Sequence, residues 1–240
     1  MDFLSSVVGP VGTNVYVVAD SRSHEAIAID TAAPCLAWLS GILVERGWRL
    51  KMIVSTHGHW DHIGDNAAVQ AWTREQAEHA AAHLGAVAGS VAPPSATAQD
   101  IEAPIAVHPL DRDRLIHPQP LFAPFEIAPS IPAVELAEGG RIVFGEIQLE
   151  VMHLPGHTEG SVGLLERAAG LLFSGDTLFA GSWGRTDLPG GSEENMAESL
   201  GRLAGLPDGL RVLPGHGAAT TIARERFWLE QVKASGRLPT

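Results

Sequence analysis

The 240-residue sequence contains one cysteine, one tyrosine and no long uninterrupted run of apolar residues. A single cysteine excludes an internal disulfide and is compatible with a reducing compartment, so we predict a cytoplasmic location. The most apolar stretch, residues 79–92, contains two histidines and is too short to span a membrane. The first ten residues lack the charged and apolar regions of a signal peptide, so none is expected.

Basic side chains are also scarce. Sixteen lysines and arginines stand against 28 aspartates and glutamates, which gives a net charge of −12. Such a surface repels phosphate backbones and anionic lipids, whereas nucleic-acid binding normally begins with a basic surface. We therefore expect neither a nucleic-acid nor a membrane partner.

The order of the apolar segments predicts a layered α/β protein, because short strand-like runs are grouped with helical patterns. We expect a single domain over residues 1–240, with an insertion at 74–104 that lies over the site region and a second proline-rich stretch at 117–132. Strands are predicted at 15–19, 26–30, 50–54, 141–144, 147–153, 161–166, 171–174 and 211–213, and helices at 35–46, 66–84, 192–203 and 222–234.

The segment Thr56–His62, Thr-His-Gly-His-Trp-Asp-His, follows the predicted strand 50–54 and contains four side chains that can bind metals. A regular helix turns about 100° per residue and could not aim all four at one point, whereas a loop at the end of a strand can. His57 and His59 can converge on one ion. Asp61 and His62, at the start of the next helix, can serve a second ion beside it. The segment therefore predicts a metal site with room for two ions.

Three further fragments each follow a predicted strand. They are Leu-Pro-Gly-His ending at His157, Ser-Gly-Asp ending at Asp176 and Leu-Pro-Gly-His ending at His216. A glycine beside each of them lets the backbone approach a ligand closely. Imidazole nitrogen and carboxylate oxygen are ligands that zinc, iron and manganese accept. Strand ends are a usual place for sites in α/β proteins, so we expect these side chains to join the first four.

The order His-x-His-x-Asp-His, then His, Asp and His, resembles the metallo-β-lactamase superfamily. The resemblance covers nearly the whole chain, from Gly12-Thr13-Asn14 to the helix after His216. It implies an αββα sandwich, in which two mixed sheets lie between helical layers and the metal site lies at one edge. It also implies two divalent metal ions as cofactors, with zinc expected and iron or manganese as alternatives.

The resemblance also implies a role for each site residue. One metal would be held by His57, His59 and His157, the other by Asp61, His62 and His216, and Asp176 would bridge both. Asp61 and Asp176 are also assigned catalytic roles. Asp30 matches an aspartate that commonly supports a ligand from behind, although the family often has proline where this chain has Thr31.

Two neighbouring metal ions can share a water molecule and lower its pKa towards 7, and one of them can polarise a carbonyl oxygen. The bridging hydroxide would then attack the substrate, and no serine or cysteine nucleophile would be needed. Lactamases of this family usually have cysteine or serine in place of Asp176. Acyl-homoserine lactonases use a tyrosine near the site, whereas the one tyrosine here, Tyr16, is on the first predicted strand.

Residues 174–191, which include Ser-Gly-Asp-Thr-Leu-Phe and Gly-Arg-Thr-Asp, resemble the glyoxalase II group and especially its compact bacterial members. Those enzymes hydrolyse S-lactoylglutathione or related thioesters, so the resemblance implies a glutathione-derived thioester substrate. Only 24 residues follow His216, too few for the C-terminal helical domain with which larger members bind glutathione. The acyl group and the thiol carrier therefore stay open.

Several alternatives remain at this point. Arg185 could contact a substrate carboxylate or pair with Asp187. A related group, the persulfide dioxygenases, holds one iron with residues matching His57, His157 and Asp176; the segment around His216 favours the hydrolase. Hydrolysis of another ester or lactone and a non-catalytic binding module are further alternatives.

Overall fold

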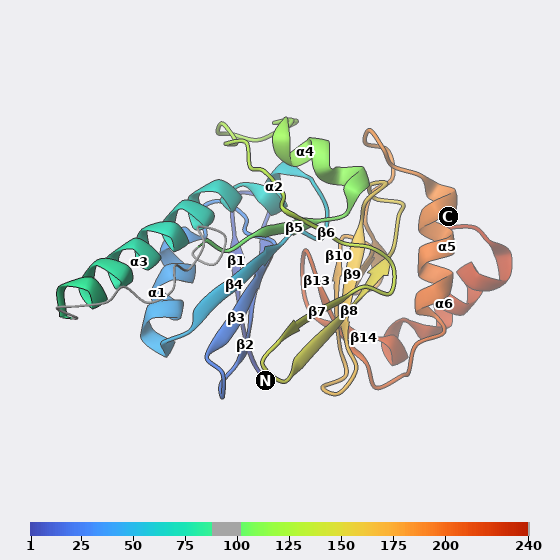
Figure 1. The fold of residues 1–240 in the computed structure, drawn as a ribbon. Coiled ribbons are helices and arrows are strands. Elements are labelled where there is room, and N and C mark those ends of the chain that lie inside the picture. The colour runs from blue at the N-terminus through green and yellow to red at the C-terminus, as the bar shows by residue number, and fades with distance from the viewer. Residues whose placement is uncertain (88–101, 240) are drawn as a thin grey trace.

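The computed structural model describes residues 1–87 and 102–239. Two mixed six-stranded sheets face each other, and helices cover the outer face of each sheet (Figure 1). This arrangement confirms the predicted αββα sandwich. No helix within the described ranges is long and apolar enough to cross a membrane.

The first sheet has the strand order β1-β2-β3-β4-β5-β6. The pairs from β1 to β3 are antiparallel and those from β3 to β6 are parallel. Parallel neighbours need a crossover connection, and α1 supplies it between β3 and β4. Together with α3, α1 covers the outer face of this sheet (Figure 1). The elements are β1 (Asp2–Val8), β2 (Thr13–Asp20), β3 (Glu25–Ile29), α1 (Leu36–Arg46), β4 (Arg49–Val54), α3 (Asn66–Val87), β5 (Ile105–Val107) and β6 (Val134–Glu135).

The second sheet has the order β14-β13-β10-β9-β8-β7, in which β10 and β13 form the parallel pair. Helix α5 connects these two strands, and α5 and α6 cover the outer face (Figure 1). The elements are β7 (Arg141–Phe144), β8 (Ile147–His153), β9 (Val162–Glu166), β10 (Leu171–Gly175), α5 (Glu193–Leu203), β13 (Arg211–Pro214), β14 (Thr220–Thr221) and α6 (Ile222–Ser235). The short elements are α2 (Trp60–Ile63), the 3₁₀ helix η2 (Pro109–Asp111), α4 (Arg112–Ile116), β11 (Leu178–Phe179) and β12 (Ser182–Trp183).

Alternation along the central strands divides the core into three apolar layers. On β2, Val17 packs under α1 and α3, whereas Tyr16 faces the other sheet. On β10, Phe173 faces the first sheet and Leu172 packs against α5 and α6. The rings of Tyr16 and Phe173 meet edge to face with centroids 5.2 Å apart. Because successive strand residues point to opposite faces, strands that lie between two layers are apolar on both sides.

The longer predicted elements are confirmed, and several of their ends have the expected cause. Gly47 ends α1 with a φ of 63°, a left-handed conformation that glycine adopts without strain. Ser192 caps α5, because its hydroxyl oxygen accepts a hydrogen bond from the backbone N–H of Asn195. Not predicted from the sequence were β1, the two-residue strands β6, β11, β12 and β14, and also β5 and α4. The last two have three and five residues, which is too short for a periodic pattern to stand out.

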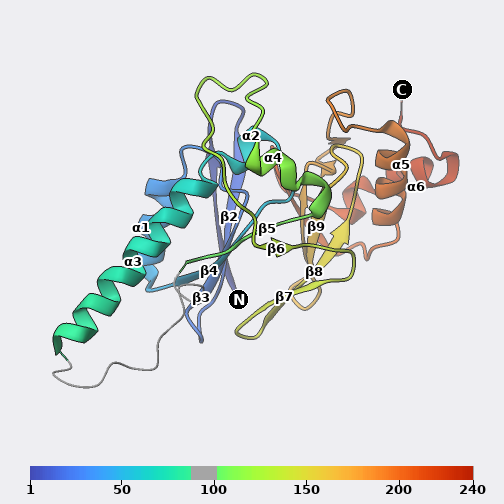
Figure 2. The same ribbon diagram turned by 45° about the horizontal axis from the view of Figure 1, so that its top comes forward.

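The predicted insertion at 74–104 falls partly outside the described residues, at 88–101. Its first part belongs to α3, which starts beside α2 and runs away from the edge where α2 and α4 lie (Figures 1 and 2). The segment between α4 and β6 lies at that edge instead (Figure 2). The described residues of the insertion therefore lead away from this edge.

Cys35 lies at the start of α1, and its side chain is completely buried in the layer between that helix and the first sheet. The Asp65 carboxylate accepts hydrogen bonds from the backbone N–H groups of Cys35 and Leu36, at 2.6 and 2.9 Å. Burial, and then the nearby Asp65 carboxylate, raise the pKa of the thiol. Packing is therefore the role of this cysteine.

We expect the thiol of Cys35 to resist a thiol-specific reagent at neutral pH in the native protein, because the thiolate is the reactive form and a raised pKa keeps the group protonated. With Ellman's reagent, one thiol per chain should react in guanidinium chloride and none over the same period in buffer. Rapid stoichiometric labelling of the folded protein would contradict this account.

Candidate metal centre

The seven side chains predicted to bind metal come together at the edge of the sandwich where α2 lies. Four strands end there, and each donates its following loop. The loop after β4 carries His57 and His59, α2 carries Asp61 and His62, and the loops after β8, β10 and β13 carry His157, Asp176 and His216. Residues up to 159 positions apart in the sequence, His57 and His216, thus meet because their strands end at the same edge.

A first set consists of His57, His59 and His157. One nitrogen of each lies within 4.8 Å of the others, and all three side chains are buried. Nδ1 of His59 is 2.8 Å from Nε2 of His157. Three imidazole nitrogens that converge in this way could hold one ion.

A second set consists of Asp61, His62 and His216. Nε2 of His62 is 3.2 Å from Nε2 of His216, and both nitrogens lie close to Oδ2 of Asp61, at 3.4 and 3.2 Å. This set could hold a second ion.

Asp176 lies between the two sets. Its Oδ2 is 3.4 Å from Nε2 of His157 in the first set and 3.4 Å from Nε2 of His216 in the second. Its Oδ1 is 3.5 Å from Nε2 of His62. A carboxylate that lies this close to both sets could be shared by two ions.

The donor atoms fit divalent metal ions. Metal–nitrogen distances of about 2.0–2.1 Å in a tetrahedral site place neighbouring ligand atoms about 3.3 Å apart, close to the separations within the second set. Nε2 of His57 and Oδ1 of Asp176 are buried and have no hydrogen-bond partner among the described residues. Buried polar atoms without a partner are costly, and a cation among them would remove that cost.

The electrostatics of the cluster also favour a cation. Burial, followed by neighbouring histidines, lowers the pKa of His57 well below its usual value and that of His59 to about 3. Both rings are therefore neutral at pH 7 and offer a lone pair. Around His62, burial works in the opposite direction, but Asp176, Asp61 and Asp30 outweigh it and raise the pKa of His62. The carboxylates thus create a point of strong negative potential.

Asp30 supports His62 from behind, as the sequence analysis predicted. Its Oδ2 is 3.0 Å from Nδ1 of His62, and its carboxylate accepts hydrogen bonds from the backbone N–H and the hydroxyl of Thr56, at 2.7 and 2.8 Å. Its φ of 58° is uncommon for a residue other than glycine. Thr31, which departs from the family's usual proline, is buried and bonds through its hydroxyl to the Asn66 side chain.

Arg185 lies at the rim of the site. Its guanidinium forms a bidentate ion pair with the Asp187 carboxylate, with both hydrogen bonds at 2.7 Å. Its backbone carbonyl oxygen lies 2.7 Å from Nδ1 of His157. The pairing with Asp187 that the sequence left as an alternative is therefore present, and the same loop orients a site histidine.

The sequence analysis did not assign a role to Asp111. This fully buried carboxylate accepts hydrogen bonds from the backbone N–H of Gly58 at 2.7 Å, the hydroxyl of Thr158 at 2.7 Å and the backbone N–H of Gly160 at 3.1 Å. It therefore ties the loop of His57 and His59 to the loop of His157. Its signal in the sequence was weak, because it is one acidic residue after a strand too short to recognise.

The cluster opens into a pocket of about 390 Å³. Five of the seven side chains reach its surface, so a substrate in this pocket would lie against them. These five are His59, Asp61, His157, Asp176 and His216.

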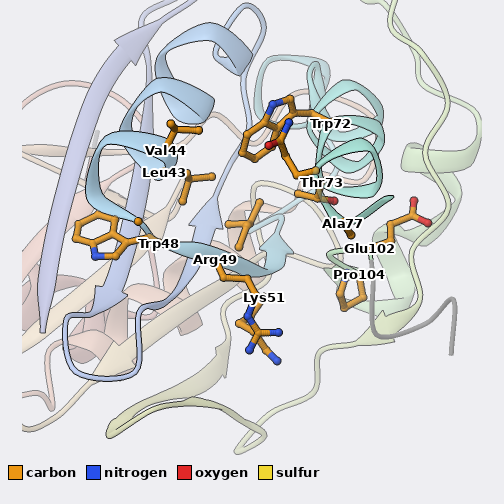
Figure 3. A pocket seen from close by; sticks show the side chains of 13 residues that line it. Leu43, Val44, Trp48, Arg49, Lys51, Trp72, Thr73, Ala77, Glu102 and Pro104 are labelled. Carbon is orange, nitrogen blue, oxygen red and sulfur yellow. The ribbon is translucent and has the colours of Figure 1, made fainter. Parts of the chain in front are cut away.

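A larger hollow of about 610 Å³ lies elsewhere, between α1, β4 and α3. Figure 3 shows Trp48 and Trp72 among the side chains around it. Its cations, Arg49 and Lys51, both approach the Glu25 carboxylate, at 3.0 and 3.6 Å. None of its lining residues in the described ranges is a histidine, so size alone does not mark the site with metal-binding chemistry.

Several known proteins are similar to this chain over most of its length. YqgX of Bacillus subtilis, a probable metallo-hydrolase, is 29% identical over 225 residues, which cover 91% of this chain and 92% of that protein. A hydroxyacylglutathione hydrolase of Thermosynechococcus vestitus is 29% identical over 202 residues, which cover 84% of this chain and 62% of that protein. The solved structure of TTHA1623 in a di-iron-bound form has a TM-score of 0.73 at 30% identity and covers 93% of this chain and 97% of its own.

The family model described as the metallo-beta-lactamase superfamily matches residues 8–216. That range includes all strands of both sheets except β14 and most of β1, and it includes all seven clustered side chains. The chain therefore belongs to the metallo-β-lactamase superfamily.

Proposed function

We propose that this protein is a metal-dependent hydrolase that cleaves a thioester, with S-lactoylglutathione as the reference substrate. Members of the superfamily are generally hydrolases. The observation that carries the proposal is the arrangement of the donors in two sets that share Asp176 and open into one pocket. Similarity to a hydroxyacylglutathione hydrolase and to a di-iron protein supports it.

In this proposal each set holds one divalent ion, zinc being expected and iron or manganese the alternatives. The first set is His57, His59 and His157, the second is Asp61, His62 and His216, and Asp176 is common to both. When bound, such a pair of ions supplies an acidified water molecule as nucleophile and polarises the carbonyl group under attack.

The residues of the chain orient these donors. Asp30 fixes the ring of His62 so that Nε2 faces Asp61 and His216, and the carbonyl of Arg185 fixes the ring of His157. For Asp61, burial works against ionisation, but His62 and His216 outweigh it and lower its pKa, so the side chain is a carboxylate at neutral pH. A thiolate is a weakly basic leaving group, so the cleavage needs no strong proton donor at the sulfur.

The identity of the thiol carrier is part of the proposal. The chain spans 62% of the length of the similar hydroxyacylglutathione hydrolase, and the rest of that protein lies outside the match. We propose that Arg185, which lines the pocket, contacts the substrate. A cytoplasmic location also stays a prediction.

One preparation tests the reaction. The protein is loaded with zinc, and separately with iron, and its metal content and S-lactoylglutathione turnover are measured on the same sample. We expect two metal ions per chain and thioester hydrolysis. One iron per chain together with oxygen uptake that depends on glutathione persulfide would identify a dioxygenase and overturn the proposal, as would inertness towards thioesters.

We expect Asp61→Asn to lower metal content from two ions per chain towards one and to reduce hydrolysis at least tenfold, because the second set loses its anionic donor. Mass spectrometry of the native protein and a thioester assay measure the two effects. Asp113→Asn is the matched control, since its carboxylate is exposed and pairs with His117 outside the site. Equal activity and metal content in the two variants would show that Asp61 has no such role.

Asp111 should affect the first set without contacting a metal. We expect Asp111→Ala to lower the affinity for the more tightly bound metal ion by about 10- to 100-fold, because the loops of His57 and His157 lose their common anchor. Competition with a chromogenic chelator measures the affinity, and circular dichroism checks folding. An unchanged affinity in a folded variant would contradict this role.

A further inference from the structure

Exposed apolar side chains gather at the mouth of the site. Of the ten large apolar residues that are exposed in the described chain, three line the 390 Å³ pocket. They are Val11, Leu121 and Phe122, with exposed fractions of 52%, 38% and 77%. Single exposed apolar residues are ordinary, but several in one hollow are typical of a binding site.

Two of the three belong to the segment between α4 and β6, which lies over this edge of the sandwich (Figure 2). That segment is anchored by other residues. Phe125 packs edge to face on Trp60, with centroids 5.9 Å apart, and Ile127 is buried in the core beneath α1 and α3. Phe122 therefore does not serve as the anchor, and its position is not explained by packing.

The rest of the pocket continues the apolar wall down to the metal donors. Trp60, Phe179 and Leu188 line it together with the three exposed residues. The ring of Phe179 lies edge to face with the imidazole of His216, with centroids 6.1 Å apart. An apolar group on this wall would thus be adjacent to the donor cluster.

Positively charged side chains are scarce in the pocket. Among the lining residues that the structure describes, Arg185 is the one with a permanently positive side chain, and Asp187 already pairs with it. Glutathione carries two carboxylates, which would need more than one partly neutralised cation. The wall is better matched to an uncharged, apolar group.

Resting on the proposed function, we propose that the apolar wall of the pocket binds an apolar substituent of the thioester. The apolar wall consists of Val11, Leu121, Phe122, Trp60, Phe179 and Leu188. The preferred substrates are then thioesters with an alkyl or aryl group larger than lactoyl on the acyl or the thiol side. The reaction is ordinary hydrolysis. The water oxygen bonds to the carbonyl carbon, the carbon–sulfur bond breaks, and a carboxylic acid and a thiol leave without any redox change.

Two substrate series distinguish the sides. The first keeps glutathione and varies the acyl group through lactoyl, butanoyl, hexanoyl and octanoyl. The second keeps lactoyl and varies the thiol through ethanethiol, butanethiol and hexanethiol. We expect kcat/KM to rise in one series by about two- to fourfold per added methylene, the upper figure corresponding to complete burial. Flat or falling values in both series would overturn the inference.

Phe122→Ser tests the wall itself. It should lower kcat/KM for the best apolar substrate about tenfold, mainly through KM, and by a smaller factor for S-lactoylglutathione. Phe227→Ser is the matched control, because Phe227 is 76% exposed on α6 and does not line the pocket. The variants should keep equal metal content. Equal losses for both substrates would count against the wall.

The two proposals fail differently. If the metal-loaded protein hydrolyses no thioester in either series, the proposed function is wrong. If it hydrolyses S-lactoylglutathione as well as or better than every apolar thioester, the proposed function stands and the apolar wall does not select the substrate.

Discussion

The crowding of five imidazoles and two carboxylates at one edge of the sandwich is the constraint on which this structure depends. Donor atoms that converge to about 3.2–3.5 Å, including two that are buried and unpaired, cannot be satisfied by hydrogen bonds alone. The pair of cations in the proposed function would satisfy them. The four strand ends and α2 hold the side chains of this cluster in place.

The support has two centres, one behind each set of donors. Asp30 joins the ends of β3 and β4 and orients His62, and its left-handed backbone shows that local conformation yields to this contact. Asp111 supports the first set, since it accepts hydrogen bonds from both loops that carry the histidines of that set. Each carboxylate thus acts on a donor, directly or through a loop.

The pocket combines two surfaces of opposite character. One is the polar cluster, which suits the reacting carbonyl group, and the other is an apolar wall built from residues of five different segments. The loops that carry the cluster directly follow strands and are tied down by Asp30 and Asp111, whereas Val11, Leu121, Phe122 and Leu188 lie on loops without these two anchors. Loops can change without disturbing the sandwich, so substrate choice can vary while the chemistry is retained.

The sequence by itself determined the layered α/β class and pointed to the seven side chains that cluster, because His57 to His62 and the three glycine-flanked fragments follow strands whose apolar runs are readable locally. Asp30 was also predicted, from the resemblance to the family. Only the tertiary structure decided the role of Asp111, whose hydrogen bond to Gly58 joins residues 53 positions apart. It also placed the segment of Phe122, rather than the described residues of 74–104, over the site. Contacts between distant segments depend on how the sheets face each other, and no local pattern records that arrangement.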